Sequence, residues 1–330
     1  MKLLGLIAAL ATLALAVPQP VQHSSGVPTG NVLSKRATFC GPQEYLETFW
    51  FLVQNGISEA APDDGSQCVT VVGQFDSLLR WSTSFTWNGA SSTPRSYSRA
   101  DRWRFQVASL SEFHSLTTNW KWSYTGSDVK AAVLFDITGG GNGAPLSGSS
   151  CRTATPDWSL QVWLGKYGDI APTSTTSSPT NIANIGSHAF DVYKGTKSSL
   201  TAYTFVANTT VTDYRGDAVD FVRWLVANEG YTNSTCVLSF SAGTEIFEGT
   251  DATFNTAQLS AEQFIRPVAE PVPPISTTRT TTYVPTPTPT ATCVPKWGQC
   301  GGIGFVPEGY DESRDGTLAA GDNSGRCSKG

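Results

Sequence analysis

The sequence contains little histidine, little methionine and little charge. Its 330 residues include three histidines and one methionine, and Asp, Glu, Lys and Arg together make up 15%. The histidines, His23, His114 and His188, stand far apart, so neither a zinc site nor a histidine-dependent triad is expected. The glycine run at residues 139–141 lacks the Lys-Ser/Thr pair of a phosphate-binding loop. These absences argue against a metal site, a triad and a nucleotide-binding loop.

The charge that is present is mildly acidic. The chain has 22 Lys and Arg against 27 Asp and Glu, a net charge of −5. Such a balance offers no electrostatic footprint for nucleic acid or for an anionic membrane. Aromatic residues make up 11% of the chain, which is typical of a packed core and not of a disordered protein.

Long hydrophobic runs are absent except at the start of the chain. Residues 1–16 carry one lysine and then an apolar run that ends in Ala14-Leu15-Ala16, which predicts a cleavable secretory signal. The run is short of the ~20 residues that a membrane-spanning helix needs. The protein is therefore expected to be secreted, with no membrane association.

Residues 17–36 are expected to be a pro-segment. They end in Lys35-Arg36, a dibasic pair after which the mature chain would begin at Ala37. The alternative is that the pair is simply two surface cations.

If the protein is secreted, its cysteines can form disulfides and its two sequons can be glycosylated. The sequons at Asn208 and Asn233 predict N-glycosylation. In an oxidising compartment the cysteines are disulfide candidates and not metal ligands. Their number is odd, so one would remain unpaired; they are Cys40, Cys68, Cys151, Cys236, Cys293, Cys300 and Cys327.

Three regions follow the pro-segment. Residues 37–268 predict one globular domain, residues 269–292 a Pro/Thr-rich linker, and residues 293–330 a small end piece. In the domain, residues 81–87 alternate apolar and polar side chains, as a strand does. Further strands are predicted at residues 129–137, 157–164, 200–207 and 236–240, and one helix at residues 217–228, capped by Asp217. Many short strands with one helix favour an all-β fold, a two-sheet sandwich of the jelly-roll kind.

Two stretches carry a resemblance to a known family. Residues 163–172 read WLGKYGDIAP and residues 243–249 read GTEIFEG. With shorter matches in the same order between residues 38 and 265, they resemble glycoside hydrolase family 12, the small secreted endo-β-1,4-glucanases and xyloglucanases. The resemblance implies a β-jelly roll whose concave sheet holds a glucan chain.

The resemblance implies a catalytic pair in which one member is replaced. Retaining glycosidases use two carboxyl groups ~5–5.5 Å apart, one as nucleophile and one as acid/base. Glu245 matches the family's acid/base, and Asp136 matches a carboxylate that supports the nucleophile. The nucleophile itself falls at Ser159, and a hydroxyl with no neighbouring base is a poor nucleophile. Asp136 or Asp157 could instead act as base toward a water in an inverting reaction, although Asp157 better fits a strand-entry role.

Four further positions match sugar-binding residues of the family. A sugar-stacking tryptophan becomes Ser58 and a methionine becomes Gln161, whereas Trp81 and Trp163 remain aromatic. For Trp81 and the aromatic residues that alternate after it, stacking on sugars and packing in a core fit the pattern equally well.

The resemblance also assigns some cysteines. Cys40 and Cys68 match the family's N-terminal disulfide, whereas Cys151 and Cys236 have no counterpart, so their pairing stays open. Residues 297–305 resemble the start of a family 1 carbohydrate-binding module, a disulfide-stapled unit that binds cellulose. Residues 306–330 depart from that pattern, so the module is expected to be truncated and not to fold as printed.

The sequence as a whole predicts a secreted, monomeric, endoglucanase-like protein that acts on plant cell-wall β-1,4-glucan or xyloglucan. No metal or organic cofactor is implied, because hydrolysis by a carboxyl pair needs none. Since Ser159 replaces the nucleophile, hydrolysis is expected to be weak or absent. The alternative is a non-catalytic glucan-binding protein or a decoy of an active relative. The retained Glu245 and Asp136 disfavour a purely structural sandwich.

Overall fold

The computed structural model describes residues 36–266, apart from residues 60–64, 90 and 142–150. The expected signal, the pro-segment up to residue 35, the linker and the end piece with its three cysteines lie outside the described residues.

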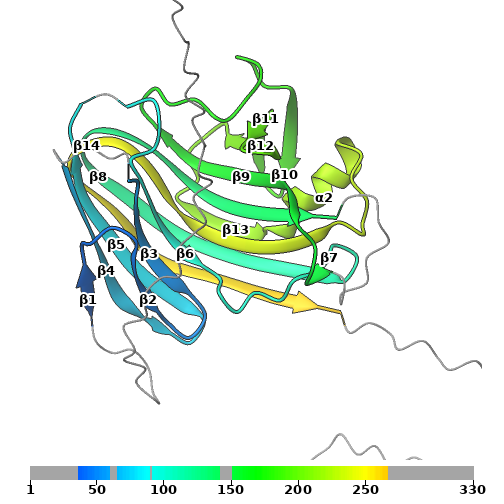
Figure 1. The fold of residues 1–330 in the computed structure, drawn as a ribbon, viewed down its shortest axis with the longest axis horizontal. Coiled ribbons are helices and arrows are strands. Elements are labelled where there is room, and N and C mark those ends of the chain that lie inside the picture. The colour runs from blue at the N-terminus through cyan, green and yellow to red at the C-terminus, as the bar shows by residue number, and fades with distance from the viewer. Residues whose placement is uncertain (1–35, 60–64, 90, 142–150, 267–330) are drawn as a thin grey trace, which may run out of the picture. The chain divides into compact units, whose positions relative to one another are not determined.

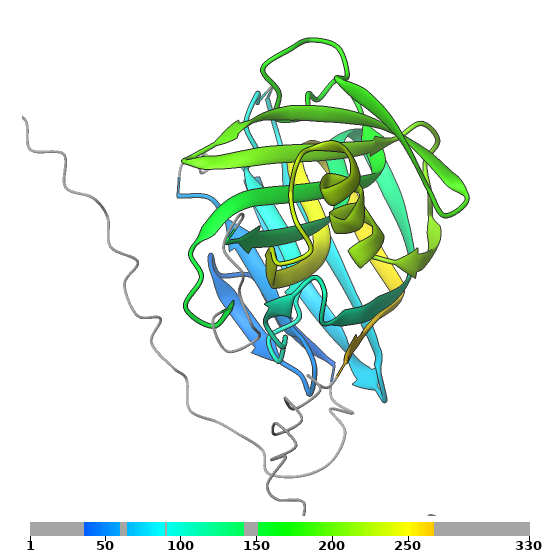
Figure 2. The same cartoon turned by 90° about the vertical axis from the view of Figure 1, so that its right-hand side faces the viewer.

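The described residues form two packed β-layers, which confirms the predicted all-β sandwich (Figures 1 and 2). Two long strands, β8 (Phe113–Gly140) and β14 (Cys236–Ile265), contribute one half to each layer. Layer one also contains β1 (Ala37–Phe39), β4 (Gly65–Phe75), β5 (Leu78–Trp87) and β13 (Asp213–Asp217). Layer two also contains β2 (Glu44–Glu47), β3 (Leu52–Ile57), β6 (Ser96–Asp101), β9 (Pro156–Tyr167), β10 (Asn181–Ile185), β11 (His188–Lys197) and β12 (Leu200–Ala207). The short β7 (Ala108–Ser109) pairs with the start of β14.

The shared strands β8 and β14 join the two layers. In layer one, residues 253–256 of β14 lie between β5 and β8, and in layer two residues 241–246 lie between β6 and β8. The register of β14 against β8 shifts repeatedly between Ile246 and Thr253, where the chain passes from one layer to the other. The short strands predicted at residues 129–137 and 236–240 are therefore pieces of longer ones, because alternation is lost locally at bulges.

The aromatic residues of β5 fill the core between the layers. Trp81, Phe85 and Trp87 each expose 3% or less of their surface. Trp81 stacks on Trp120 with 6.5 Å between ring centroids, and Trp120 packs at 5.2 Å against Phe135 of layer two. Of the two readings that the sequence left open for Trp81, this burial favours packing in the core over stacking on sugar.

The predicted helix is present as α2 (Val219–Asn228). Its Phe221 packs on Phe190 and Phe205 at 5.1 and 5.3 Å between ring centroids, which anchors the helix to the core. Its N-cap is Ala218 and not Asp217, although the Asp217 carboxylate accepts a hydrogen bond from the Val219 N–H at 3.1 Å. No helix in the described part of the chain has the length and apolar character that a membrane crossing requires.

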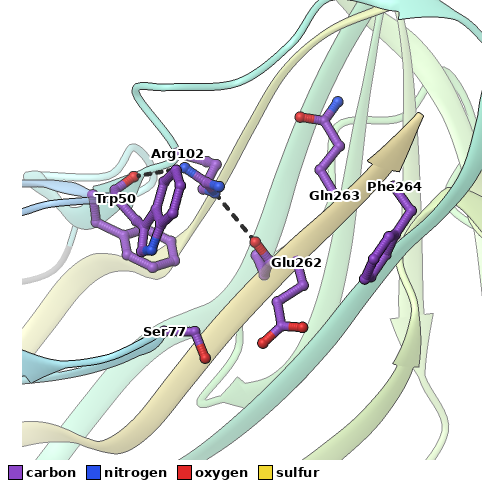
Figure 3. A pocket seen from close by; sticks show the side chains of 8 residues that line it. Trp50, Ser77, Arg102, Glu262, Gln263 and Phe264 are labelled. Carbon is purple, nitrogen blue, oxygen red and sulfur yellow. Dashed lines mark hydrogen bonds between the residues drawn. The ribbon is translucent and has the colours of Figure 1, made fainter. Parts of the chain in front are cut away.

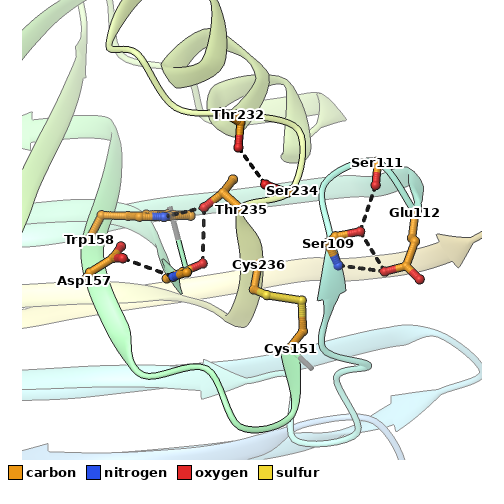
Figure 4. Close-up of a disulfide and its surroundings, with 12 residues drawn as sticks. Ser109, Ser111, Glu112, Cys151, Asp157, Trp158, Thr232, Ser234, Thr235 and Cys236 are labelled. Carbon is orange, nitrogen blue, oxygen red and sulfur yellow. Dashed lines mark hydrogen bonds between the residues drawn. A yellow bond between two sulfur atoms is a disulfide. The ribbon is translucent and has the colours of Figure 1, made fainter. Parts of the chain in front are cut away.

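Two disulfides join cysteines of the described domain. The Cys40–Cys68 bridge confirms the expected N-terminal pair. Cys151 pairs with Cys236, the first residue of β14, which settles the pairing that the sequence left open (Figure 4).

Candidate active site

Side chains of layer two that point away from the core form one surface, which we call the site face. The even-numbered residues of β9 from 158 to 164 belong to the core, so Ser159, Gln161 and Trp163 lie on the site face. The same alternation places Asp136 of β8 and Glu245 of β14 there. The fold thus brings together five residues that the sequence singled out.

Gln161 lies between the two carboxylates of this face. Its Nε2 donates a hydrogen bond to Glu245 Oε1 at 2.9 Å and another to Asp136 Oδ2 at 3.3 Å. Its Oε1 accepts a hydrogen bond from Trp163 Nε1 at 3.0 Å. Both amide hydrogens and the amide oxygen are engaged, so the orientation of the side chain is fixed. Because the carboxylates share one donor nitrogen, the amide occupies the space between them.

A cation that sequence reasoning missed also reaches this site. Lys197 ends β11, and its Nζ lies 3.7 Å from Glu245 Oε1. Strand pairing explains why Lys197 comes close to Glu245. Lys197 pairs with Leu200 of β12, and two residues further along β12, Ala202 pairs with Ser159 of β9. The Lys197 side chain is half exposed, so solvent screens part of the attraction. No local pattern in the sequence marks this lysine, since its place depends on how β11, β12 and β9 pair.

Burial raises the pKa of both carboxyl groups. For Glu245, which is 7% exposed, loss of solvation is the main cause; Lys197 and Gln161 oppose it, and the charge of Asp136 adds to it. For Asp136, loss of solvation again raises the pKa, and Lys197, Gln161 and Arg99 oppose it. Two neighbouring carboxyl groups with raised pKa values are typical of a site that transfers protons.

Replacing Glu245 with glutamine is expected to stabilise the protein at neutral pH. Because the pKa is raised, folded Glu245 keeps its proton to a higher pH than it does in the unfolded chain. The free energy of unfolding therefore falls as the pH rises above the ordinary carboxyl pKa of about 4.3. The variant lacks this loss, so it should melt a few degrees higher at pH 7, at about 2–4 °C per kcal/mol. Thermal melts between pH 4 and pH 8 measure the difference, which should shrink toward pH 4; a difference independent of pH would contradict the raised pKa.

Two residues on neighbouring strands extend the site face beyond Glu245. Tyr97 of β6 lies directly across from Glu245, and Gly56 of β3 lies across from Tyr97. Ser58 follows Gly56 by two positions, just after the end of β3, where its N–H bonds to the Arg95 carbonyl at 2.8 Å. Ser58 therefore lies at the margin of the face, while Tyr97, which the sequence did not indicate, lies beside the acid/base candidate.

Trp163 supports the site without offering a stacking surface. It is 2% exposed and packs with Leu134 and Phe247 in a small apolar cluster on the site face. Because the ring is covered, this burial favours a packing role for Trp163 over the predicted stacking on sugar. Its indole N–H holds the Gln161 amide instead.

Asp157 is used at the entrance to β9. Its Oδ2 accepts a hydrogen bond from the Gly141 N–H at 3.0 Å, across the start of the β8–β9 pair (Figure 4). The carboxylate ties the two strands together where their pairing begins. This contact favours the strand-entry role over the role of a substitute base.

Glycine at position 243 allows β6 to approach β14 closely. A Cβ atom at Gly243 would lie 2.2 Å from Ser98 O and 2.7 Å from the Cα of Arg99. Both are backbone atoms, so any side chain here would push β6 away from β14. Because Glu245 follows two residues later, this glycine keeps the acid/base candidate opposite Tyr97.

A separate cavity of about 320 Å³ opens where Arg102 links the two layers (Figure 3). Arg102 donates hydrogen bonds to the carbonyl oxygens of Trp50 and Ala261, each at 3.2 Å. The only carboxylate in the lining is Glu262, so this cavity lacks a carboxyl pair; its lining is Trp50, Phe51, Ser77, Arg102, Ala261, Glu262, Gln263 and Phe264. Among the residues that the structure describes, no three His, Cys, Asp or Glu side chains gather as a metal ion would need.

Comparison with known proteins identifies the family. The model of Glycosyl hydrolase family 12 matches residues 50–263. The chain is 34% identical over 229 residues to xyloglucan-specific endo-beta-1,4-glucanase A of Aspergillus niger, covering 69% of this chain and 91% of that protein. The protein of the same name from Emericella nidulans is 31% identical, with 69% and 92% covered. The crystal structure of Trichoderma harzianum endoglucanase 3 matches with a TM-score of 0.61 and 29% identity, over 70% of this chain and 99% of that one. Since the family model covers more than half of the chain and these fungal relatives span most of their own length, the chain belongs to glycosyl hydrolase family 12.

Proposed function

We propose that this protein is secreted and binds a β-1,4-glucan or xyloglucan chain along the site face, while hydrolysing it weakly or not at all. The observation that carries the proposal is a buried acid/base candidate, Glu245, on a face where the nucleophile position holds Ser159. Relatives named as xyloglucan-specific endoglucanases support the substrate class. The signal expected at residues 1–16 supports the extracellular location.

Two contacts partly oppose the protonation of Glu245 that hydrolysis needs. A general acid must enter the reaction protonated. Glu245 instead receives a hydrogen bond from Gln161 and lies 3.7 Å from the Lys197 ammonium, and both contacts favour its charged form. Burial acts in the opposite direction and is the larger cause, so the pKa of Glu245 stays raised and the two contacts only reduce that rise.

The inverting alternative has little support in this geometry. An inverting pair needs ~6.5–9.5 Å between carboxyl groups, with a water between the base and the sugar. Asp136 and Glu245 instead share the Gln161 amide nitrogen as donor, so the amide stands where that water would have to lie. Asp157 is engaged at the entrance to β9.

Glucan binding with little or no hydrolysis is the expected result for the natural protein. Calorimetric titration with xyloglucan oligosaccharides and cellohexaose measures binding, and reducing-end release from xyloglucan and mixed-linkage β-glucan measures hydrolysis. Arg223→Gln is a matched control, because Arg223 of the helix pairs with Asp217 at the end of β13 and with Asp220, away from the site face. Hydrolysis as fast as that of the Ser159→Glu variant, and abolished by Glu245→Gln, would contradict the proposal, and an inverted product anomer would then point to Asp136 as base. The absence of binding to any of these glucans would contradict it equally.

A further inference from the structure

The cavity beside Arg102 lies apart from the site face. Its lining comes from the loop before β3, the turn between β4 and β5, and the last residues of β14 (Figure 3). Ala261 of β14 belongs to the core, whereas Glu262 and Phe264 are exposed on the outer surface of layer one. Glu245, by contrast, lies in the part of β14 that belongs to layer two. The cavity and the site face are therefore two separate places on the domain.

Exposed aromatic side chains gather around this cavity. In the part of the chain that the structure describes, four large aromatic side chains expose between 42% and 58% of their surface; they are Phe49, Phe75, Trp103 and Phe264. Phe264 lines the cavity itself, Phe49 directly precedes one lining residue, and Phe75 stands two positions before another. Single apolar residues on a surface are ordinary, but a gathered set marks a binding surface.

Hydrogen bonds fix the segments that carry these aromatic residues. Gln74 Oε1, next to Phe75, accepts hydrogen bonds from Thr48 Oγ1 at 2.6 Å and from the Trp50 N–H at 3.1 Å. The indole N–H of Trp103 donates to the Thr48 carbonyl at 3.1 Å. The loop before β3, the β4–β5 turn and the segment after β6 are thereby held against one another. A surface that is already ordered loses less conformational entropy when a ligand binds.

Two aromatic rings lie at opposite ends of the cavity. The Trp50 ring is fixed, because the Arg102 guanidinium lies over it at 4.3 Å from the ring centroid and Phe49 meets it edge-on at 4.6 Å between centroids. Phe264 lies at the other end, beyond Glu262 on the same face of β14 (Figure 3). The C–H groups on the face of a sugar ring are apolar, so they can pack against such aromatic rings.

Two polar groups of the lining remain available to a ligand. The Ser77 hydroxyl and the Glu262 carboxylate both line the cavity, and neither forms a hydrogen bond or ion pair with another described residue. The carboxylate can accept hydrogen bonds from two hydroxyl groups, and the serine can donate or accept one. Arg102 already donates to two backbone carbonyls, and its charge offsets that of Glu262. With one charge of each sign, the lining favours a neutral ligand rich in hydroxyl groups over an ion.

We propose that this cavity is a second saccharide-binding site, which takes a sugar residue of a β-linked glucan. Trp50 and Phe264 pack against the sugar ring, while Ser77 and Glu262 bond to its hydroxyl groups. The volume of about 320 Å³ lies at the lower end of the range for small-molecule sites, as a ligand of this size requires. The inference goes beyond the proposed function, because the cavity binds glucan without any residue of the site face.

A second site changes how the protein holds a polymer. A glucan that engages both sites dissociates only when both contacts are lost, so the apparent affinity exceeds that of either site alone. Polymeric xyloglucan should therefore bind more tightly than a short oligosaccharide. Phe264→Ala should lose this advantage, which migration in gels that contain the polysaccharide measures.

Fluorine NMR of the full mature chain, labelled with fluorotryptophan, separates the two sites. Trp50 reports on the cavity and Trp163 on the site face, and a Trp→Phe substitution at each position identifies its signal. With cellotetraose as the probe, we expect both signals to move. Phe264→Ala should weaken binding at Trp50 by about 5-fold or more and leave the Trp163 response unchanged. Ile182→Ala, which truncates an exposed apolar side chain of β10 outside the cavity, is the matched control and should change neither response.

The carboxylate has its own test. Glu262→Gln removes the charged acceptor and keeps the size of the side chain, so binding at Trp50 should weaken by about 3-fold or more. Melting temperatures establish that this variant and Phe264→Ala are folded. An unchanged Trp50 response in both variants would overturn the placement of the sugar in this cavity.

The two signals keep this inference apart from the proposed function. A Trp50 signal that stays in place while the Trp163 signal moves would overturn the second site and leave glucan binding on the site face intact. The reverse result would overturn binding on the site face and support the cavity as a saccharide site. A Trp50 signal that moves with tetramethylammonium ion and not with cellotetraose would assign the cavity to cations and overturn the inference.

Discussion

Replacing Ser159 with glutamate is expected to give a protein that hydrolyses xyloglucan or mixed-linkage β-glucan, where the natural protein releases few or no reducing ends. The substitution returns a carboxylate to the side of the sugar opposite Glu245, so the two-step retaining reaction becomes possible. Removing a nucleophile from an enzyme of known mechanism costs orders of magnitude in rate, so the gain should be at least about 10³-fold. Reducing-end assays on both proteins measure it.

The glutamine variant at the same position separates charge from size. Ser159→Gln places a side chain of nearly the same shape there without a carboxylate, so it should stay inactive. If Ser159→Gln and Ser159→Glu behave alike, position 159 is not the nucleophile position and the assignment fails. Product analysis adds a second criterion, because the active variant should release products with retained anomeric configuration.

The Ser159→Glu variant also makes it possible to measure how far Lys197 affects the protonation of Glu245. Its ammonium, 3.7 Å from Glu245, favours the charged form of an acid that hydrolysis needs protonated. Adding Lys197→Met to Ser159→Glu should therefore move the alkaline limb of the pH–rate profile to higher pH. A limb that stays in place would mean that solvent screens the lysine completely.

Removing the Cys151–Cys236 bridge is expected to lower stability more than any other change considered for the scaffold. The two cysteines are 85 residues apart, and closing a loop of that length in the unfolded chain is worth about 4–5 kcal/mol. For a domain of this size, that corresponds to a fall in melting temperature of roughly 10 °C. The double substitution Cys151→Ser with Cys236→Ser, followed by thermal melts, measures the loss.

The N-terminal bridge is the matched comparison. Cys40 and Cys68 are 28 residues apart, so the same reasoning gives about 3–4 kcal/mol. The Cys151–Cys236 bridge also adjoins a buried contact, in which Thr235 Oγ1 accepts a hydrogen bond from Trp158 Nε1 at 3.0 Å and donates one to Gly140 O (Figure 4). Equal losses for the two double variants would show that loop length does not set the stabilisation here.

The alternation of apolar and polar residues predicted where strands occur, but not whether the apolar face of a strand is buried in the core or exposed to solvent. The alternation of Trp81, Phe85 and Trp87 marked a strand, and β5 covers it. Whether its aromatic face met a partner layer or solvent depended on β8 and β14, which lie far away in sequence and supply Trp120 and Phe254 around Trp81. Alternation alone carries no such information.

Site residues could be predicted where they match a family motif. They could not be predicted where their contacts depend on how the strands pair. Glu245, Asp136 and Gln161 were singled out by position, and the fold brings both carboxylates within hydrogen-bonding distance of the Gln161 amide. Lys197 and Tyr97 were missed, because each reaches Glu245 through strand pairing and not through a nearby motif. The assignment of Ser159 as the nucleophile position still rests on the resemblance, and the glutamate variant tests it.

The position of β14 has a consequence for how the protein is made. This strand, residues Cys236–Ile265, is central to both layers, yet it is the last strand of the described chain to leave the ribosome. Until then β5 and β6 lack the neighbour that connects them to β8, and apolar residues such as Trp120 remain uncovered. Strand pairings between residues this distant in sequence form slowly, and synthesis proceeds at only ~5–20 residues per second. The strand edges of the nascent domain therefore stay unpaired until β14 has been synthesised. Folding should therefore be completed after nearly the whole domain has been synthesised, during a period when the chain depends on chaperones to avoid aggregation.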